Sequence, residues 1–126
     1  MRKFLLLSSA ALSMFAVGCV SAEEVCESGV ELACERAHEC TAQATKDNAT
    51  WQAAFGTSVA DCKTKLTTAS KCSEKKELDQ LCTDADAGKK FNLSKASECA
   101  DARKAQSCAD YADTAKTPAA CKVRCE

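Results

Sequence analysis

The stretch that decides the fold is CESGVELACERAHECT, residues 26–41. Its apolar residues and cysteines recur three and four positions apart, and the opposite side carries Glu27, Glu31, Glu35 and Glu39. This period of about 3.6 residues is typical of an amphipathic α-helix, which Gly29 weakens without breaking. Half-cystines must bring their Cα atoms within about 7 Å, so cysteines on the apolar side of a helix mark places where helices touch. The stretch therefore predicts a helix that is cross-linked to its neighbours.

The same helical period continues along the chain in shorter segments. A capping type of residue precedes each expected helix: Asn48, Ser58, Ser73, Ser94, Ser107 and Thr117. Asn48 begins a segment that ends at Gly56, and the segment after Ser73 stops at Gly88. Asn48 and Asn92 also match glycosylation sequons, but we expect both to act as caps. No alternating run of β-branched residues indicates a sheet, so the sequence predicts an all-α fold, a small bundle of five or six short helices.

Large apolar side chains are scarce in residues 23–126. These 104 residues contain eleven Leu, Val and Phe, no Ile, one Trp and twenty Ala. So small an apolar content is typical of chains that cannot fold by burial alone. We therefore expect disulfides to replace the missing core, and full reduction to unfold the domain. Trp51 and Phe55 share one helical face, where we expect core packing rather than an exposed binding spot.

The N-terminus has the pattern of an export signal. Arg2 and Lys3 precede about fifteen mostly apolar residues, a run that is too short to span a membrane. Cleavage after Ala22 gives a signal peptide over residues 1–22 and a single disulfide-rich helical domain over 23–126. The alternative is a lipoprotein signal over residues 1–18, because the segment 15–19 is similar to a lipobox whose Cys19 would be lipidated.

The cysteine count is odd until Cys19 is assigned to export. The chain has 11 Cys, and ten remain as expected disulfide partners: Cys26, Cys34, Cys40, Cys62, Cys72, Cys82, Cys99, Cys108, Cys121 and Cys125. Ten cysteines form about five bridges in an oxidising compartment, in any of 945 pairings. Helical geometry predicts different partners for Cys121 and Cys125, and separate partners for Cys34 and Cys40.

No residue pattern indicates catalysis or a metal. Cys34 and His38 are four apart, as helical zinc ligands can be, but the chain has one His and no Cys-x-x-Cys. The Cys121–Cys125 spacing is also wrong for a redox motif. His38 among glutamates lacks a nucleophile to activate, and we expect it at the surface. We therefore expect no catalytic, cofactor-binding or metal-ligating residue, and the net charge of −1 argues against nucleic acid as a partner.

The cysteine and alanine pattern resembles a family of exported proteins. The spacing from Ala60-Asp61-Cys62 to Cys72, from Phe91 to Cys99 and on to Cys108, with the ending Pro118-Ala119-Ala120-Cys121, is similar to that of Cys- and Ala-rich exported proteins of myxobacteria and related Gram-negative soil bacteria. The resemblance covers roughly residues 25–125 and implies export and a disulfide-rich architecture. It implies no catalytic residue, and Cys26 and Cys125 depart from the pattern.

Two functions from different classes follow. The first is an exported, non-enzymatic module, periplasmic or extracellular, whose partner is an unknown protein or envelope component. Its alternative form is an outer-membrane lipoprotein, in which the lipid on Cys19 is the only membrane contact. The second is a secreted effector, such as a protease inhibitor or toxin, which needs an exposed reactive loop. Gly88–Asn92 and Ala112–Thr117 are the candidate loops.

Overall fold

A computed structural model describes residues 19–126, which contain seven α-helices and four short 3₁₀-helices. The α-helices are α1 (Ala22–Cys40), α2 (Gln43–Lys46), α3 (Ala49–Phe55), α4 (Val59–Ala69), α5 (Leu93–Ala105), α6 (Cys108–Ala112) and α7 (Ala119–Lys122). The 3₁₀-helices are η1 (Cys72–Glu74), η2 (Leu78–Leu81), η3 (Asp84–Asp86) and η4 (Thr114–Lys116). In this part of the chain the only β-type pairing is an isolated antiparallel bridge between Phe91 and Cys125. The all-α class is confirmed, with seven α-helices over the described residues where five or six were expected; the short helix α2 was not among those predicted.

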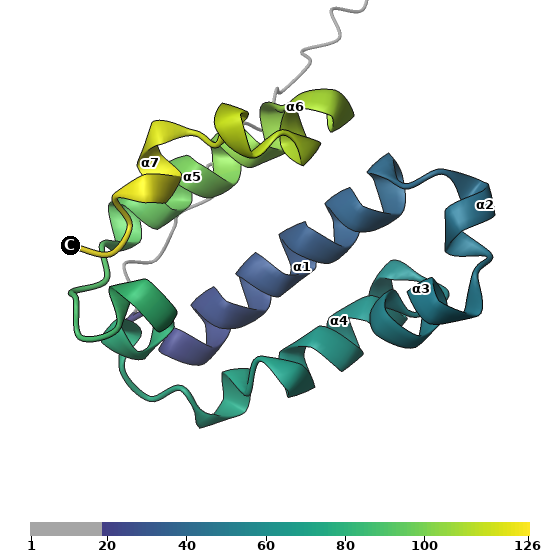
Figure 1. Ribbon diagram of the computed structural model, residues 1–126. Helices are drawn as coiled ribbons and strands as arrows, with labels where there is room; N and C mark the ends of the chain where they lie inside the picture. The colour runs from purple at the N-terminus through teal and green to yellow at the C-terminus, as the bar shows by residue number, and fades with distance from the viewer. Residues whose placement is uncertain (1–18) are drawn as a thin grey trace, which may run out of the picture.

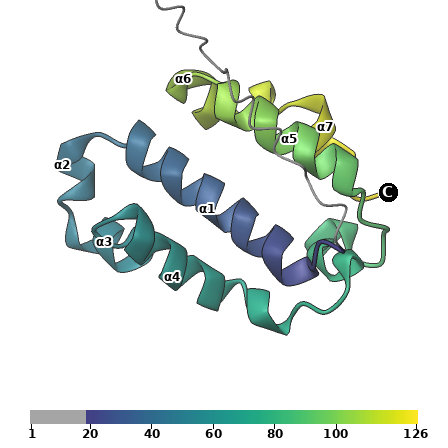
Figure 2. The ribbon, with the colours of Figure 1, turned by 180° about the vertical axis from the view of Figure 1, so that it is seen from behind.

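Helix α1 lies at the centre of the molecule. Helices α3 and α4 pack along one side of it, and α5, α6 and α7 lie along the other (Figure 1). The view from behind shows the same order, with the 3₁₀ turns η1–η3 crossing from one side to the other near the start of α1 (Figure 2). Every other part of the fold is therefore organised around the stretch quoted first, residues 26–41.

Side-chain caps start five of the seven α-helices of the described residues, and the expected caps Asn48, Ser58 and Ser107 are confirmed. The expected caps Ser94 and Thr117 are wrong, because Ser94 lies inside α5 and α7 follows Pro118 without a side-chain cap. Asn48 accepts a hydrogen bond from the Thr50 amide at 2.8 Å, and Asn92 accepts one from the Lys95 amide at 3.0 Å. Ser58 and Ser107 cap α4 and α6 in the same way. Such caps satisfy amides that have no partner within the helix. Both sequon asparagines thus have the capping role that was expected of them.

Helix α1 begins earlier than the apolar stripe alone suggests. Ser21 and Glu24 form a capping box, in which each side chain accepts the other residue's backbone amide. Ala22 follows as the first helical residue and is buried. The expected domain boundary between residues 22 and 23 therefore falls inside the first turn of α1. The expected signal segment lies mostly outside the described residues, of which Cys19 is the first.

The prediction of a helix after Ser73 is wrong. Residues 72–86 form three separate 3₁₀ turns, joined by extended residues. Side chains bind the backbone here in place of a helical ladder: Gln80 accepts from the amides of Lys76 and Glu77, and Asp79 accepts from the amide of Phe91. Polar side chains that bond to nearby backbone compete with helix formation, which explains the irregular course.

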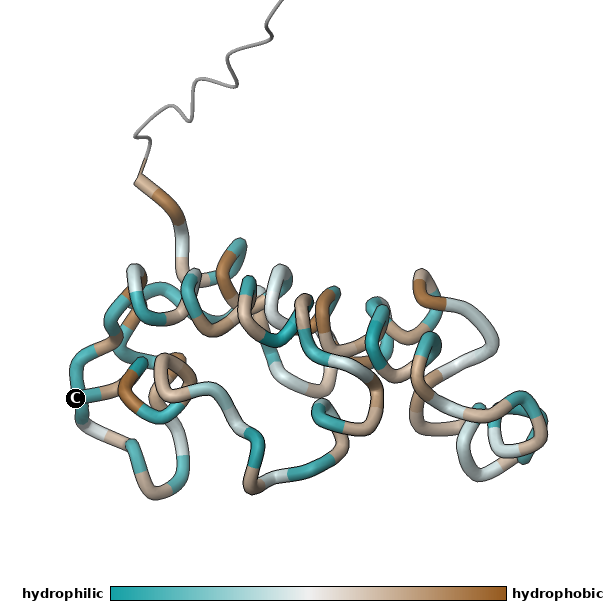
Figure 3. Tube along the Cα trace, turned by 90° about the horizontal axis from the view of Figure 1, so that it is seen from above, coloured by the Kyte–Doolittle hydropathy of each residue, from teal (hydrophilic) through white to brown (hydrophobic). Residues whose placement is uncertain are grey.

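Half-cystines make up most of the buried apolar set. Within residues 19–126 it consists of Ala22, Cys34, Cys62, Cys72, Cys82, Cys99 and Cys125. No Leu, Val, Phe, Trp or Tyr in this part of the chain is fully buried. Hydrophobic residues are correspondingly scattered along the trace instead of gathered in one layer (Figure 3). The interior is thus built from disulfides, in agreement with the expectation that bridges replace a conventional core.

Candidate functional site

All ten expected half-cystines are paired. The bridges are Cys26–Cys72, Cys34–Cys62, Cys40–Cys108, Cys82–Cys125 and Cys99–Cys121, with Cα–Cα distances between 4.7 and 5.8 Å. As predicted, Cys121 and Cys125 have different partners, and so do Cys34 and Cys40. These distances lie within the range that an unstrained backbone allows.

The bridges connect α1 to both of its sides. Helix α1 carries three half-cystines, which bind η1, α4 and α6. The remaining two bridges join α5 to α7 and fasten the C-terminal residues to the segment after η2. Five disulfides in so short a chain indicate an oxidising compartment, extracellular or periplasmic. None of the helices described is long and apolar enough to cross a membrane.

Cys19 stands apart from this network. It is exposed and is the one free cysteine of the described residues, next to the exposed Val20. The capping box of α1 follows two residues later, so Cys19 lies directly beside the folded domain. The structure thereby leaves Cys19 accessible, in keeping with its separation from the ten structural cysteines.

The α2–α3 corner is held without any cysteine. Here the rings of Trp51 and Phe55 stack with their centroids 5.2 Å apart, and the His38 ring meets Trp51 edge-on at 4.8 Å. His38 Nε2 also lies 3.2 Å from the Phe55 carbonyl oxygen, which ties α3 to the end of α1. The three rings therefore form a small aromatic cluster. His38 is half-buried within it and is not the isolated surface residue that we expected.

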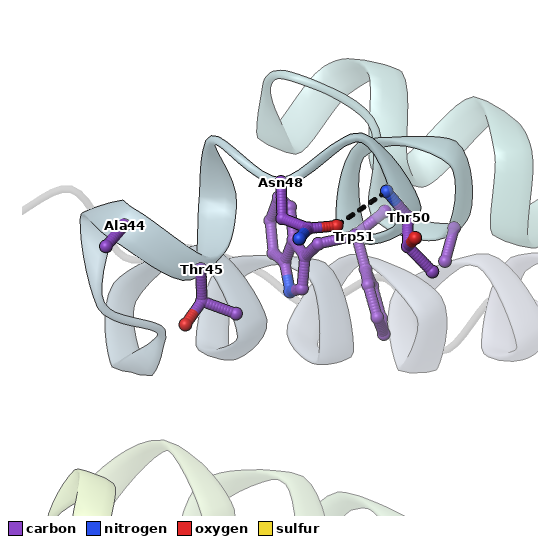
Figure 4. A pocket seen from close by; sticks show the side chains of 7 residues that line it. Ala44, Thr45, Asn48, Thr50 and Trp51 are labelled. Atoms are coloured by element: carbon purple, nitrogen blue, oxygen red, sulfur yellow. Dashed lines mark hydrogen bonds between the residues drawn. The ribbon is translucent and has the colours of Figure 1, made fainter.

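Trp51 and Phe55 pack against each other and against His38 but are only half-buried, as most large apolar side chains of residues 19–126 are. Both also line an open hollow of about 550 Å³ between α2 and α3. Ala44, Thr45, Asn48, Thr50 and Ala54 complete its lining, and Figure 4 shows these side chains around the indole. The helical stripe correctly placed both rings on one face, but no other element of the described chain covers that face completely.

A smaller, polar hollow of about 270 Å³ adjoins the first. Its lining includes Trp51 again, together with His38, Gln43, Lys46, Asp47, Gln52 and Thr57. Several of these polar groups bond to one another: the Lys46 amine donates to the His38 carbonyl at 3.0 Å, and the Gln43 amide donates to Asp47 at 2.7 Å. Trp51 thus stands between an apolar and a polar surface, the arrangement common to small-ligand sites. Sequence reasoning identified Trp51 but missed the polar residues around it.

A buried arginine fixes α6 to α1. Arg36 donates to Glu39 at 2.7 Å and to the Gln106 carbonyl at 2.6 Å, and its guanidinium lies 5.0 Å from the centre of the Tyr111 ring. Arg103 also lies over this ring, at 4.3 Å. These contacts satisfy most of a buried charge and make Tyr111 a packing residue. Sequence reasoning missed Arg36, although its position four residues before Cys40 places it on the cross-linked side of the helix.

Three surface contacts perturb ionisable groups. The Lys90 amine and the Phe91 amide both donate to Asp79, and these hydrogen bonds lower the pKa of Asp79 and raise that of Lys90. Glu31 likewise raises the pKa of Lys63, its hydrogen-bond partner. The Ser21 amide and hydroxyl lower the pKa of Glu24 in the capping box. All are exposed structural contacts, and none adjoins a nucleophile.

The Cys34–His38 pair that was considered for zinc binding does not form a metal site. Cys34 forms a disulfide with Cys62 and has no free thiolate, so the Cys34–His38 pair cannot hold zinc. Asp84 and Asp86 lie in the exposed turn η3, where Asp86 pairs with Lys89. Over residues 19–126, no group of three or more His, Cys, Asp or Glu side chains has the arrangement of a metal site.

No family model, curated protein or solved structure matches the chain.

Proposed function

We propose that the chain is an exported, disulfide-stabilised module without enzymatic activity, which binds a component of the cell envelope or of its surroundings. The observation that carries this proposal is the interior itself: ten half-cystines are paired, and six of them form most of the buried apolar set. Such an interior forms only where thiols are oxidised. The α2–α3 hollow presents partly exposed aromatic rings beside neutral polar groups, and this surface supports a binding role.

We further propose that the module is retained at a membrane through a lipid on Cys19. Cleavage after Ala22 would remove Ser21, the cap of α1, together with the buried Ala22. Loss of such a cap costs about 0.5–2 kcal/mol. It would also place the new ammonium group at the helix N-terminus, where the helix dipole disfavours positive charge. Processing before Cys19 keeps the whole capping box, which favours the lipoprotein signal over the cleavage after Ala22 expected first.

The intact mass of the protein isolated from its own cells tests both statements. We expect a chain that begins at a lipidated Cys19 and lacks ten hydrogen atoms because five bridges have formed. A chain that begins at Glu23 would refute the anchor and leave the exported module standing. An unprocessed chain with free thiols would refute the exported module as well. A Cys19→Ala variant is the matched control, and we expect it to lose its membrane association.

The protease inhibitor has less structural support. In the loop Gly88–Asn92, the Lys90 amide and carbonyl are both bonded to Glu126, and the Asn92 amide is bonded to Arg124. The loop Ala112–Thr117 is largely taken up by η4. A protease binds its substrate as an extended strand with free backbone groups, and neither loop offers one. Inhibition of any protease in a panel by stoichiometric amounts of this protein would favour the protease inhibitor over the binding module.

A further inference from the structure

The hollow between α2 and α3 exposes two of the chain's few large apolar side chains. Trp51 is the only tryptophan of the chain, and both it and Phe55 are half-buried, with part of each ring lining the hollow. The apolar surface that they leave open is available to a ligand, and its burial would yield about 25 cal/mol per Å². Exposed aromatic surface in a hollow is typical of a ligand site.

The rim of the hollow carries hydrogen-bonding groups that the folded chain does not use. The side-chain oxygen of Asn48 accepts the hydrogen bond that caps α3, so its carboxamide NH₂ has no partner within the described residues (Figure 4). The hydroxyls of Thr45 and Thr50 and the indole N–H of Trp51 likewise have no protein partner among the described residues. A ligand here meets aromatic rings and neutral polar groups side by side.

The charge of the site favours a neutral ligand. No ionisable side chain lines the larger hollow. In the smaller one, Lys46 and Asp47 are bonded only to neutral groups, the His38 carbonyl and the Gln43 amide, so both keep a net charge. The larger hollow alone offers no opposite charge to an anionic or cationic ligand.

We propose that the α2–α3 hollow binds a neutral saccharide. A pyranose ring has an apolar C–H face, which packs against the exposed surface of Trp51 and Phe55, and hydroxyl groups, which bond to Asn48, Thr45 and Thr50. The open side of the hollow lets the ring belong to a longer glycan. This inference rests on the proposed binding function and names its ligand class. An apolar peptide segment would leave the neutral polar groups desolvated and unpaired, which is costly.

The lone tryptophan makes the test direct. The purified, disulfide-bonded protein is titrated with N-acetylglucosamine, glucose and galactose oligosaccharides while the fluorescence of Trp51 is recorded. Isothermal calorimetry gives a second readout that does not depend on the tryptophan. We expect a saturable change with at least one neutral oligosaccharide, and weaker binding of an anionic one, polygalacturonate fragments.

One substitution separates ligand binding from helix capping. Asn48→Asp keeps the oxygen that caps α3 but removes the free NH₂ group, and we expect it to weaken saccharide binding about tenfold or more. Asn92→Asp is the matched control, because Asn92 caps α5 through its own side-chain oxygen and does not line the hollow. We expect that variant to bind as the wild type does.

Three outcomes would overturn the saccharide site: no saturable response to any neutral oligosaccharide, equal effects of Asn48→Asp and Asn92→Asp, or tighter binding of an apolar peptide. None of these would bear on export, which the mass of the cellular protein tests separately.

Discussion

Removal of the Cys34–Cys62 bridge tests whether disulfides act here as a core or only as chain constraints. The double variant Cys34→Ala/Cys62→Ala opens a bridge with a sequence separation of 28, for which the chain-entropy model gives about 3–4 kcal/mol. Both half-cystines are 0% exposed, so loss of their sulfur atoms also leaves unfilled space at the α1–α4 contact. At about 1 kcal/mol for each buried sulfur, the total loss is about 5 kcal/mol.

The matched control is Cys40→Ala/Cys108→Ala. Its bridge spans the largest separation, 68 residues, and chain entropy alone gives it about 4–5 kcal/mol. Both cysteines are only half-buried, so their removal adds little packing loss. Guanidinium denaturation followed by far-UV circular dichroism gives the unfolding free energy of each variant. We expect removal of the buried pair Cys34–Cys62 to lower the unfolding free energy by at least as much as removal of Cys40–Cys108. A clearly larger loss in the control would refute the core role, because chain entropy would then set the order.

Further predictions concern the backbone and the surface. Gly29→Ala should stabilise the protein by about 0.5–1 kcal/mol, because the residue is exposed inside α1 and its added Cβ meets nothing within 4 Å; a lower melting temperature would contradict this. Gly56→Ala should destabilise it by at least about 1–2 kcal/mol, because φ is +72° and the new Cβ would clash with the Asp61 side chain; an unchanged melting temperature would refute the clash. The Asp79–Lys90 pair should stabilise the fold above about pH 4, and this contribution should disappear as pH falls through the lowered pKa of Asp79. The gap in unfolding free energy between wild type and Asp79→Asn should therefore close in acid, and a gap independent of pH would argue against the pair.

Local features of the fold were predictable because local chemistry determines them. Asn48 and Ser58 lie where a side-chain oxygen meets free amides, and the structure confirms both caps. The helical period of residues 26–41 likewise predicts α1. Cys121 and Cys125 have different partners, as predicted, but α7 ends at Lys122, so Cys125 is not on the helix from which that prediction was made. The actual partners depend on how helices pack, and no local rule selects one pairing among 945.

Long-range contacts explain what the sequence did not predict. The segment after Ser73 was expected to be helical because it carries apolar residues such as Leu78 and Leu81 at helical spacing. Instead, Asp79 accepts hydrogen bonds from Lys90 and from the Phe91 amide, and the segment forms 3₁₀ turns. The surroundings of Trp51 also depend on long-range contacts. The helical pattern shows that Trp51 and Phe55 point to the same side of α3, but whether that side is exposed depends on which other elements cover it.

We infer that five disulfides take the place of a hydrophobic core in this protein. Full reduction under native conditions tests it most directly, with thiol counting to show that all ten cysteines are free and circular dichroism to follow the helices. We predict loss of most helical signal and of any cooperative thermal transition. A fully reduced protein that keeps its native spectrum and unfolds cooperatively on heating would contradict the claim.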